Sequence, residues 1–144
     1  MNAPRAIAAG LIGTATMTAL LQIEPNVGLP NIAMGQILGS SLGLASALPS
    51  VGPALGWVLY FLIGALFALG FAAALDGKLP GTPLLRGALF GLLVFLLAQV
   101  AFMPFTGGGV FSRGDLQLIT GSLLGHLIYG GVTGWIYHGG AVAA

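Results

Sequence analysis

The chain contains no cysteine and very few charged residues. Of its 144 residues, 4 are Lys or Arg and 3 are Asp or Glu, together 5%, whereas a soluble globular domain carries about 25% charged residues. The missing cysteines exclude disulfides, thiolate-bound zinc and a thiol nucleophile. A net charge of +1 offers no basic surface for nucleic acid. With 57% hydrophobic residues the chain is also too apolar for intrinsic disorder. The class that remains is an integral membrane protein.

Four hydrophobic segments are each long enough to cross a bilayer, whose hydrocarbon core requires a helix of about 20 residues. They cover residues 3–23, 53–75, 83–103 and 116–137. Their apolar residues come in long runs and not in alternation, which favours helices over a barrel. Asn2 and Thr82 precede two of these segments as caps, and Ser112 to Asp115 has the spacing of a capping box before the last. We therefore predict an all-α membrane protein, a single domain over residues 1–144 with four transmembrane helices in a compact bundle.

The first loop, residues 24–52, is too long for a hairpin turn. Within residues 31–48, apolar residues recur every three to four positions, with glycine and serine on the other face. This period predicts an interfacial helix, lying in the surface of the membrane. Because the segment lacks Lys and Arg, we interpret it as a lid or as a docking surface for a neighbouring subunit.

Three of the four basic residues fall on one side of this topology. Arg5, Lys78 and Arg86 lie on the side of both termini, and Arg113 lies on the other. Basic residues are enriched in cytoplasmic loops. The sequence therefore predicts a multi-pass protein with both termini in the cytoplasm.

Small residues recur at four-residue spacing along the predicted spans. They allow helix backbones to approach closely in lipid, where the hydrophobic effect does not drive helices together. The predicted helix-packing residues are Gly10, Thr14, Gly56, Gly64, Gly87, Gly91, Gly121, Gly125, Gly130 and Gly134. The opposite faces, such as that of Phe90, Leu93 and Leu97, are expected to contact lipid or partner subunits.

Reactive groups are scarce in the predicted spans. No Asp, Glu, Lys or Arg falls deep inside one of them, which argues against a proton pump or an ion-coupled transporter. The sequence contains no paired carboxylates, no phosphate-binding loop with its lysine and no Ser-His-Asp set. We therefore predict that the chain is not an enzyme, with no catalytic residues and no metal site.

His126 lies near the middle of the fourth predicted span. One interpretation is a neutral histidine that bonds across the bundle to Tyr60, Gln99 or a threonine of the first helix, because a polar group inside a membrane needs a partner. Tyr60, Gln99 and His126 form the predicted polar interior. In an alternative interpretation, a small polar cavity beside His126 is lined by Gln22, Gln99, Thr14, Thr16 and Thr18.

Two further roles are open for His126. It could ligate a haem or a chlorophyll-type pigment, with Gly130 and Gly134 leaving room for the macrocycle, or it could relay protons. His138 lies twelve residues further on, about 18 Å along a helix, so the two histidines cannot bind one iron. Apart from this pigment, no cofactor is predicted.

The run from His126 to Gly130, followed by Gly134 and Tyr137, resembles small uncharacterised bacterial membrane proteins with four spans. Their last helix carries a similar His-x-x-Tyr-Gly pattern, and their first hairpin has a Leu-Pro-Asn-like turn before a short Gly/Ser-rich helix. Tyr60 stands where the resemblance leads us to expect a more polar residue. The resemblance implies no activity and favours a bacterial cytoplasmic (inner) membrane.

Two functions fit these observations. The first is a non-catalytic accessory or structural subunit that packs within a larger bacterial membrane complex, respiratory or photosynthetic. The alternative is a stand-alone small carrier, channel, or lipid- or tetrapyrrole-binding protein that uses the polar cavity around His126. The expected partners are the lipid bilayer and other membrane subunits, and not nucleic acid.

Overall fold

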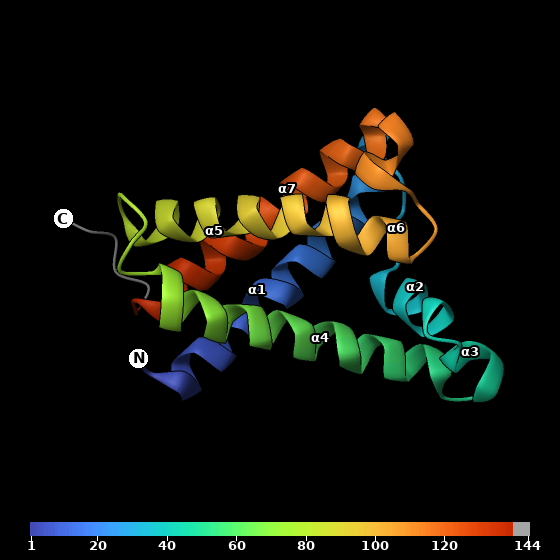
Figure 1. The fold of residues 1–144 in the computed structure, drawn as a ribbon, viewed down its shortest axis with the longest axis horizontal. Coiled ribbons are helices and arrows are strands. Elements are labelled where there is room, and N and C mark those ends of the chain that lie inside the picture. Colours follow the sequence, from blue (N-terminus) through green and yellow to red (C-terminus); the bar gives the residue numbers. More distant parts are fainter. Residues whose placement is uncertain (140–144) are drawn as a thin grey trace.

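The computed structural model describes residues 1–139, and helices are its only regular elements over that range. The long helices are α1 (Ala3–Ile23), α4 (Gly52–Gly70), α5 (Pro83–Leu97) and α7 (Leu116–Tyr137) (Figure 1). Shorter elements are η1 (Glu24–Val27), α2 (Met34–Ser41), α3 (Leu44–Ala47), η2 (Phe71–Leu75), η3 (Ala98–Phe102), α6 (Met103–Phe105) and η4 (Val110–Gly114). The π-helical turns η2 and η3 extend α4 and α5 without a break in the chain.

Short polar side chains begin three of the long helices. Asn2, Thr82 and Asp115 accept backbone N–H groups of the first turn of α1, α5 and α7, at 3.1, 3.3 and 3.0 Å. The capping box predicted at Ser112 is wrong, because Asp115 is the cap and Ser112 bonds to Gln99 instead. Each cap satisfies backbone donors that the helix itself leaves unpaired.

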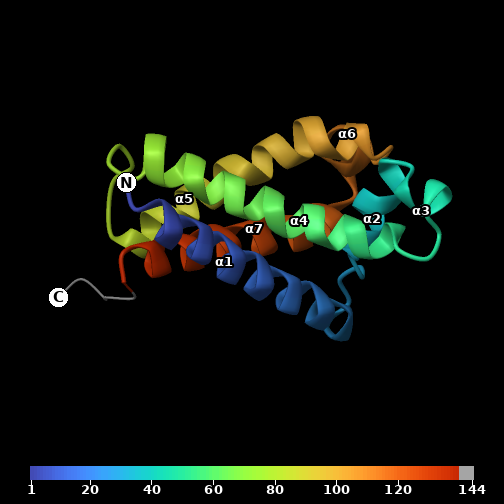
Figure 2. The same ribbon diagram turned by 90° about the horizontal axis from the view of Figure 1, so that it is seen from below.

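Helix α7 packs against α5 on one side and α1 on the other (Figure 2). The contact with α5 is between backbones, since a Cβ at Gly130 would lie 2.6 Å from Cα of Gly91. The contact with α1 is similar, since a Cβ at Gly13 would lie 2.8 Å from the carbonyl oxygen of Tyr129. Glycine at these positions therefore sets the distance between the helices.

Helix α4 packs on α1, and α2 packs on α4 in turn. A Cβ at Gly10 of α1 would lie 2.7 Å from the carbonyl oxygen of Gly64. The hydroxyl of Tyr129 donates to that same carbonyl at 2.6 Å and joins α7 to α4 through the core. The four long helices thus form one packed unit.

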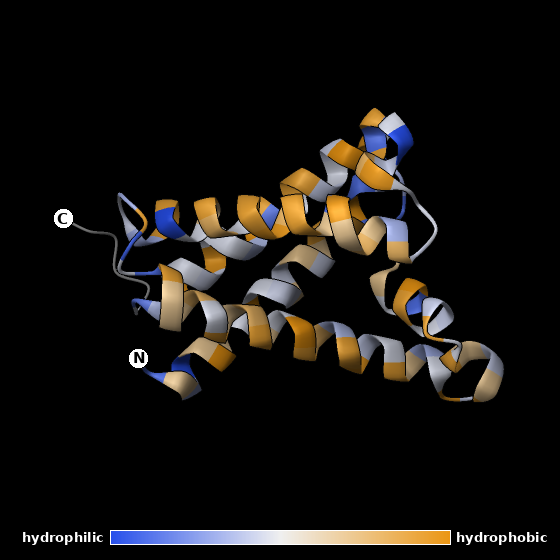
Figure 3. Ribbon diagram, in the orientation of Figure 1, coloured by the Kyte–Doolittle hydropathy of each residue, from blue (hydrophilic) through white to orange (hydrophobic). Residues whose placement is uncertain are grey.

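Three helical stretches are long and apolar enough to cross a membrane: Ala3–Val27, Gly52–Leu75 and Pro83–Phe105. Hydrophobic residues cover most of the length of α4 and α5 (Figure 3). Helix α7 has 22 residues but is not among these stretches, because its glycines and polar residues lower its mean hydropathy. The structure thus supports three of the four predicted spans by length and composition.

The predicted outward face of the third span needs one correction. Leu93 and Leu97 are 46% and 50% exposed, so neither is buried in a helix contact, but Phe90 is 3% exposed. Its ring stacks on Phe71, with centroids 5.0 Å apart, and also meets Tyr129. Phe90 belongs to the core, which explains how the adjoining ends of α4 and α5 are held together.

The first loop contains two short helices, α2 and α3, where the sequence predicts one. The break falls at Gly43, whose φ of 70° is left-handed and unfavourable for other residues. The glycine face of α2 packs on α4, with Gly35 against the ring of Trp57 and a Cβ at Gly39 only 3.0 Å from the carbonyl oxygen of Gly52. The glycines of this segment therefore make the contact, which leaves its apolar face free for another surface.

Candidate functional site

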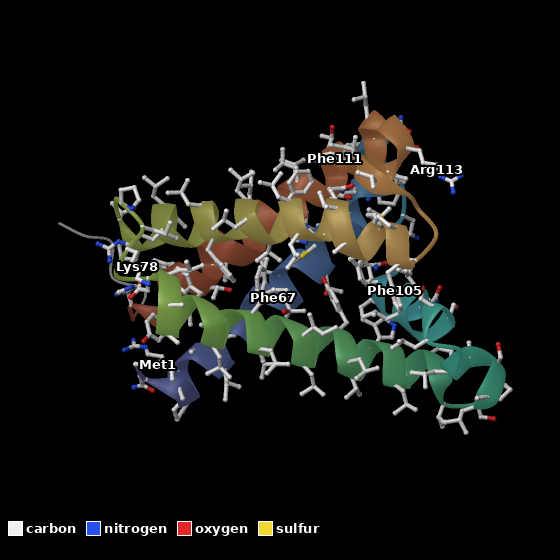
Figure 4. The ribbon with its side chains drawn as sticks, viewed as in Figure 1. Met1, Phe67, Lys78, Phe105, Phe111 and Arg113 are labelled. Atoms are coloured by element: carbon white, nitrogen blue, oxygen red, sulfur yellow. The ribbon has the colours of Figure 1, made fainter. Side chains whose placement is uncertain are left out.

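A cavity of about 560 Å³ lies between α4 and α5. These consecutive helices meet at the Phe71–Phe90 pair but otherwise hardly touch, because α4 packs on α1 while α5 packs on α7. Met17 of α1 and Tyr129 of α7 line the inner wall. Met34, Ile37 and Leu38 of α2 line one end, as does Phe105 of α6; Phe67 of α4 lines the side (Figure 4). The apolar face of α2 therefore closes one end of the cavity.

Gln99 is the most buried polar residue of the cavity wall, with 0% of its surface exposed. The π-helical turn η3 carries it, and such turns often occur at functional sites. Its Oε1 accepts from the hydroxyl of Ser112 at 3.0 Å, while its Nε2 has no partner within residues 1–139. An amide nitrogen left with two unused donors is costly in an apolar interior. The Nε2 of Gln99 is therefore a donor whose hydrogen bonds a ligand in the cavity would complete.

Ser112 reaches Gln99 from a strained turn. Phe111, Ser112 and Arg113 are consecutive and left-handed, with φ of 46°, 49° and 53°. This conformation costs about 1–2 kcal/mol per residue for side chains other than glycine. Strain of this kind persists where the surroundings hold it, often at binding sites. The sequence gives no cue for it, since only the tertiary contact explains why a serine occupies this position.

His126 lines the same cavity from α7. Its Nδ1 lies 2.7 Å from the carbonyl oxygen of Ser122 in the preceding turn. A carbonyl cannot donate, so Nδ1 carries the proton and Nε2 of the neutral ring keeps its lone pair. That Nε2 forms no hydrogen bond within the described residues. The predicted bond across the bundle is therefore not formed, and the ring is fixed by its own helix.

Tyr60 borders the cavity from α4, 8% exposed, and its hydroxyl also lacks a partner within residues 1–139. Its ring is held edge-on by Trp57, with centroids 5.9 Å apart. The structure thus brings the predicted polar residues Tyr60, Gln99 and His126 to one cavity, each from a different helix. None of the three bonds to another.

The threonines of α1 contribute less than the polar-cavity hypothesis expects. Thr14, Thr16 and Thr18 each donate to the carbonyl four residues earlier, at 2.8 to 2.9 Å. Only Thr14 lines the cavity. Gln22 is exposed at the outer end of the helix. Their bonding capacity is used within the helix, as is usual for threonine in apolar helices.

The predicted small residues lie at helix contacts. Gly87, Gly91, Gly130 and Gly134 join α5 to α7; Gly10, Thr14 and Gly64 join α1 to α4; Gly125 faces α1; Gly121 faces Glu24 of η1; Gly56 faces α2. Gly130 and Gly134 are therefore occupied by the backbone of α5 and leave no room for a macrocycle. Any space beside His126 is that of the cavity itself. The pigment remains a prediction.

Glu24 is a buried charged residue that sequence analysis missed, and it lies outside the cavity wall. It directly follows the predicted first span, but it is 2% exposed. Neither carboxylate oxygen has a partner within residues 1–139, and one lies where a Cβ of Gly121 would be 2.7 Å away. Because Gly121 has no side chain, the carboxylate of Glu24 fits beside α7. The sequence alone does not indicate this, because it does not show that Glu24 and Gly121 lie side by side.

Polar contacts join the helix ends at the opposite end of the molecule. His138 Nε2 lies 2.7 Å from Asp76 Oδ1, and Arg86 lies 3.9 Å from the same oxygen. Arg5 donates to the carbonyl of Ile136 at 3.3 Å. These contacts fix the ends of α1, α5 and α7 around the end of α4, remote from the cavity polar groups.

The fold and the site together define a helical protein with three helices able to cross a membrane and an apolar cavity between two of them. A family model matches residues 1–141, and the chain belongs to this family, described as a family of unknown function (DUF6789). No curated protein and no solved structure matches the chain. The cavity is therefore the main guide to function.

Proposed function

We propose that this chain is an integral membrane protein that binds a hydrophobic small molecule, without catalysis, in the cavity between α4 and α5. The observation that carries the proposal is the cavity itself, about 560 Å³ with a largely apolar wall and buried polar groups that have no partner among residues 1–139. Small-molecule sites are typically about 300–1,000 Å³, apolar, with a few polar groups that orient the ligand. Empty space of this size between packed helices is otherwise destabilising.

Helix α7 would be the fourth span of a four-helix bundle. It lies between α1 and α5 and packs against both, so it must run through the membrane if they do. Its low hydropathy supports this position, because its glycine face contacts protein and not lipid. Lys78 lies at the end where the chain begins (Figure 4), and Arg5 and Arg86 contact Ile136 and Asp76 at the same end, which favours the cytoplasm for that end.

The role as accessory subunit in a larger complex remains a prediction. The exposed leucines of α4, such as Leu62 and Leu66, would suit a partner, but a lipid-facing helix needs the same residues. The cavity is not explained by such a role. The composition and the resemblance to small bacterial proteins support the inner membrane of a bacterium as the location.

Native mass spectrometry of the protein released from its own membranes in mild detergent tests the proposal. We expect a discrete added mass on the wild type, and its loss in Ala98→Trp, because Ala98 lines the cavity and an indole there occupies it. Ala74→Trp is the matched control, since Ala74 is exposed and outside the cavity. Wild type without any bound molecule, or equal occupancy in Ala98→Trp, contradicts the proposal.

The same sample tests the pigment. His126 lines the cavity with Nε2 uncommitted, which is the state an axial histidine needs. A Soret band that disappears in His126→Ala would identify the bound molecule as a tetrapyrrole. A colourless sample with a bound mass excludes the pigment and leaves the binding function in place.

A further inference from the structure

We propose that the cavity selects an uncharged amphiphile whose head carries a hydroxyl group, and that Tyr60, Gln99 and His126 bind this head. The inference rests on the proposed function, because it specifies the class of molecule held in the same cavity. Three properties of the wall support it: its charge, its hydrogen-bonding capacity and the depth of its polar groups.

The wall of the cavity carries no formal charge when His126 is neutral. All seven Asp, Glu, Lys and Arg residues of the chain lie within the described residues 1–139, and none of them lines the cavity. A charged head group buried there would lose its hydration without gaining a counter-ion, at a large cost. Fatty carboxylates, phosphates and sulfates are therefore excluded, and the ligand is neutral.

Three polar groups deep in the wall have no partner within residues 1–139. The amide Nε2 of Gln99 can only donate, the hydroxyl of Tyr60 can donate or accept, and Nε2 of His126 can only accept because Nδ1 holds the proton. A carbonyl or ether oxygen on a ligand could only accept, and would leave the imidazole unsatisfied. A hydroxyl group accepts through its oxygen and donates through its hydrogen, so among these oxygen head groups it is the one that can satisfy both Gln99 and His126.

The three residues lie at similar depth in the molecule. Tyr60 is eight residues from the start of α4, Gln99 is six residues from the end of α6, and His126 is ten residues from the start of α7. At 1.5 Å per residue these are about 12, 9 and 15 Å from the same end, where α6, the start of α4 and the start of α7 lie (Figure 1). Since all three also line the same cavity, we place the head group at this depth, against all three residues.

The rest of the wall suits a hydrocarbon tail. Phe67 and Leu97 are among its many apolar residues, and Met17, Met34 and Met103 add flexible thioethers. Methionine adapts its shape to irregular apolar partners. The cavity thus combines a small polar band with a larger apolar volume, as an amphiphile requires.

Three lipids with one chain and different heads test this selectivity: oleyl alcohol, oleyl methyl ether and oleyl sulfate. Each is added to the delipidated protein, and its apparent Kd is measured from the bound fraction in native mass spectra. We expect oleyl alcohol to bind about tenfold more tightly than the ether, as one additional buried hydrogen bond provides, and the sulfate to bind more weakly than both. No binding of any of the three contradicts the proposed function. Equal binding of all three contradicts only the selectivity.

Two variants test which residue accepts a hydrogen bond from the head group and which residue donates one to it. His126→Leu should abolish the preference for alcohol over ether, because it removes the acceptor. Tyr60→Phe should weaken both lipids and keep the preference, because a donor serves either oxygen. The change removes one hydroxyl that has no partner in the described part of the chain, so we expect the fold to be preserved. Gln117→Leu, an exposed change on α7, should alter neither Kd. A preference that survives in His126→Leu overturns the inference.

Discussion

Individual glycines determine how closely the long helices approach. Gly130 and Gly91 bring the backbones of α5 and α7 together, and Gly10 does the same for α1 and α4. In lipid such contacts replace the hydrophobic effect as the source of helix association. Other glycines of the same helices face open space; a Cβ at Gly70 would have no atom of another described element within 4 Å. The role of a glycine therefore depends on its place in the fold and not on its spacing in the sequence.

The first prediction compares two glycine substitutions. Gly130→Ala should destabilise the protein by about 1–3 kcal/mol, because the new methyl overlaps the backbone of Gly91 and the helices must separate. Gly70→Ala should be neutral or stabilising by up to about 1 kcal/mol, because alanine favours the helix and meets nothing. The fraction of monodisperse protein after heating in detergent measures both. Equal melting of the two variants would contradict the packing described here.

The second prediction concerns the bond between Ser112 and Gln99. Ser112→Ala should cost about 1–3 kcal/mol, because it leaves the fully buried Oε1 of Gln99 without a donor. Ser40→Ala, at an exposed position, serves as the control and should change little. Thermal unfolding of both variants in the same detergent checks the difference. Unchanged stability of Ser112→Ala would show that Gln99 has another partner.

Helices and their ends were largely predictable from local sequence. Long apolar runs mark α1, α4 and α5, and the caps Asn2 and Thr82 act within one turn, so both signals are local. The features that sequence analysis missed depend on contacts between segments far apart in the chain. They are the break at Gly43, the turn at Ser112 and the burial of Phe90 and Glu24. Predicting each of them requires knowing which residues pack against it.

The site was predictable in its composition but not in its geometry. Polar residues are so rare in the apolar segments that Tyr60, Gln99 and His126 stand out. Their hydrogen bonds do not follow from spacing, because His126 bonds to its own helix and Gln99 bonds to a loop thirteen residues away. The separation of α4 from α5, which creates the cavity, depends on how each helix packs on another partner.

The third prediction concerns α2 as a closing element. Gly35→Leu should push α2 away from α4, because the side chain would overlap the ring of Trp57. In a Trp135→Phe background, where Trp57 is the remaining tryptophan, its emission should then shift to the red as water enters. Gln36→Leu, on the exposed face of the same helix, should leave the emission unchanged. A constant spectrum in Gly35→Leu would contradict the contact between α2 and α4.

The molecule as a whole is polar at its ends and apolar along its sides (Figure 3). Asp76, Arg86 and His138 connect three helix ends at one end, and Arg113 and Asp115 lie at the other. This distribution suits a protein that crosses a bilayer, with the cavity between its ends. The basic residues at the two ends also favour one orientation of the protein in the membrane, with both termini in the cytoplasm.

The fourth prediction tests that orientation. The chain has no cysteine of its own, so single cysteines report one position each. Ser50→Cys should react with a membrane-impermeant maleimide on intact cells, and Lys78→Cys only after permeabilisation, because these exposed residues lie at opposite ends. Labelling of both on intact cells, or the reverse pattern, would contradict the topology.

The central claim is that the space between α4 and α5 holds a ligand inside the membrane, and a photoreactive residue tests it in place. p-Benzoyl-phenylalanine at position 67 replaces a phenylalanine that lines the cavity, and at position 66 it replaces Leu66, which is 65% exposed on the outer face. After irradiation of intact membranes, we predict one discrete small-molecule adduct at position 67 and a spread of phospholipid adducts at position 66. The same phospholipid spread at both positions, or crosslinks from position 67 to protein alone, would contradict the account.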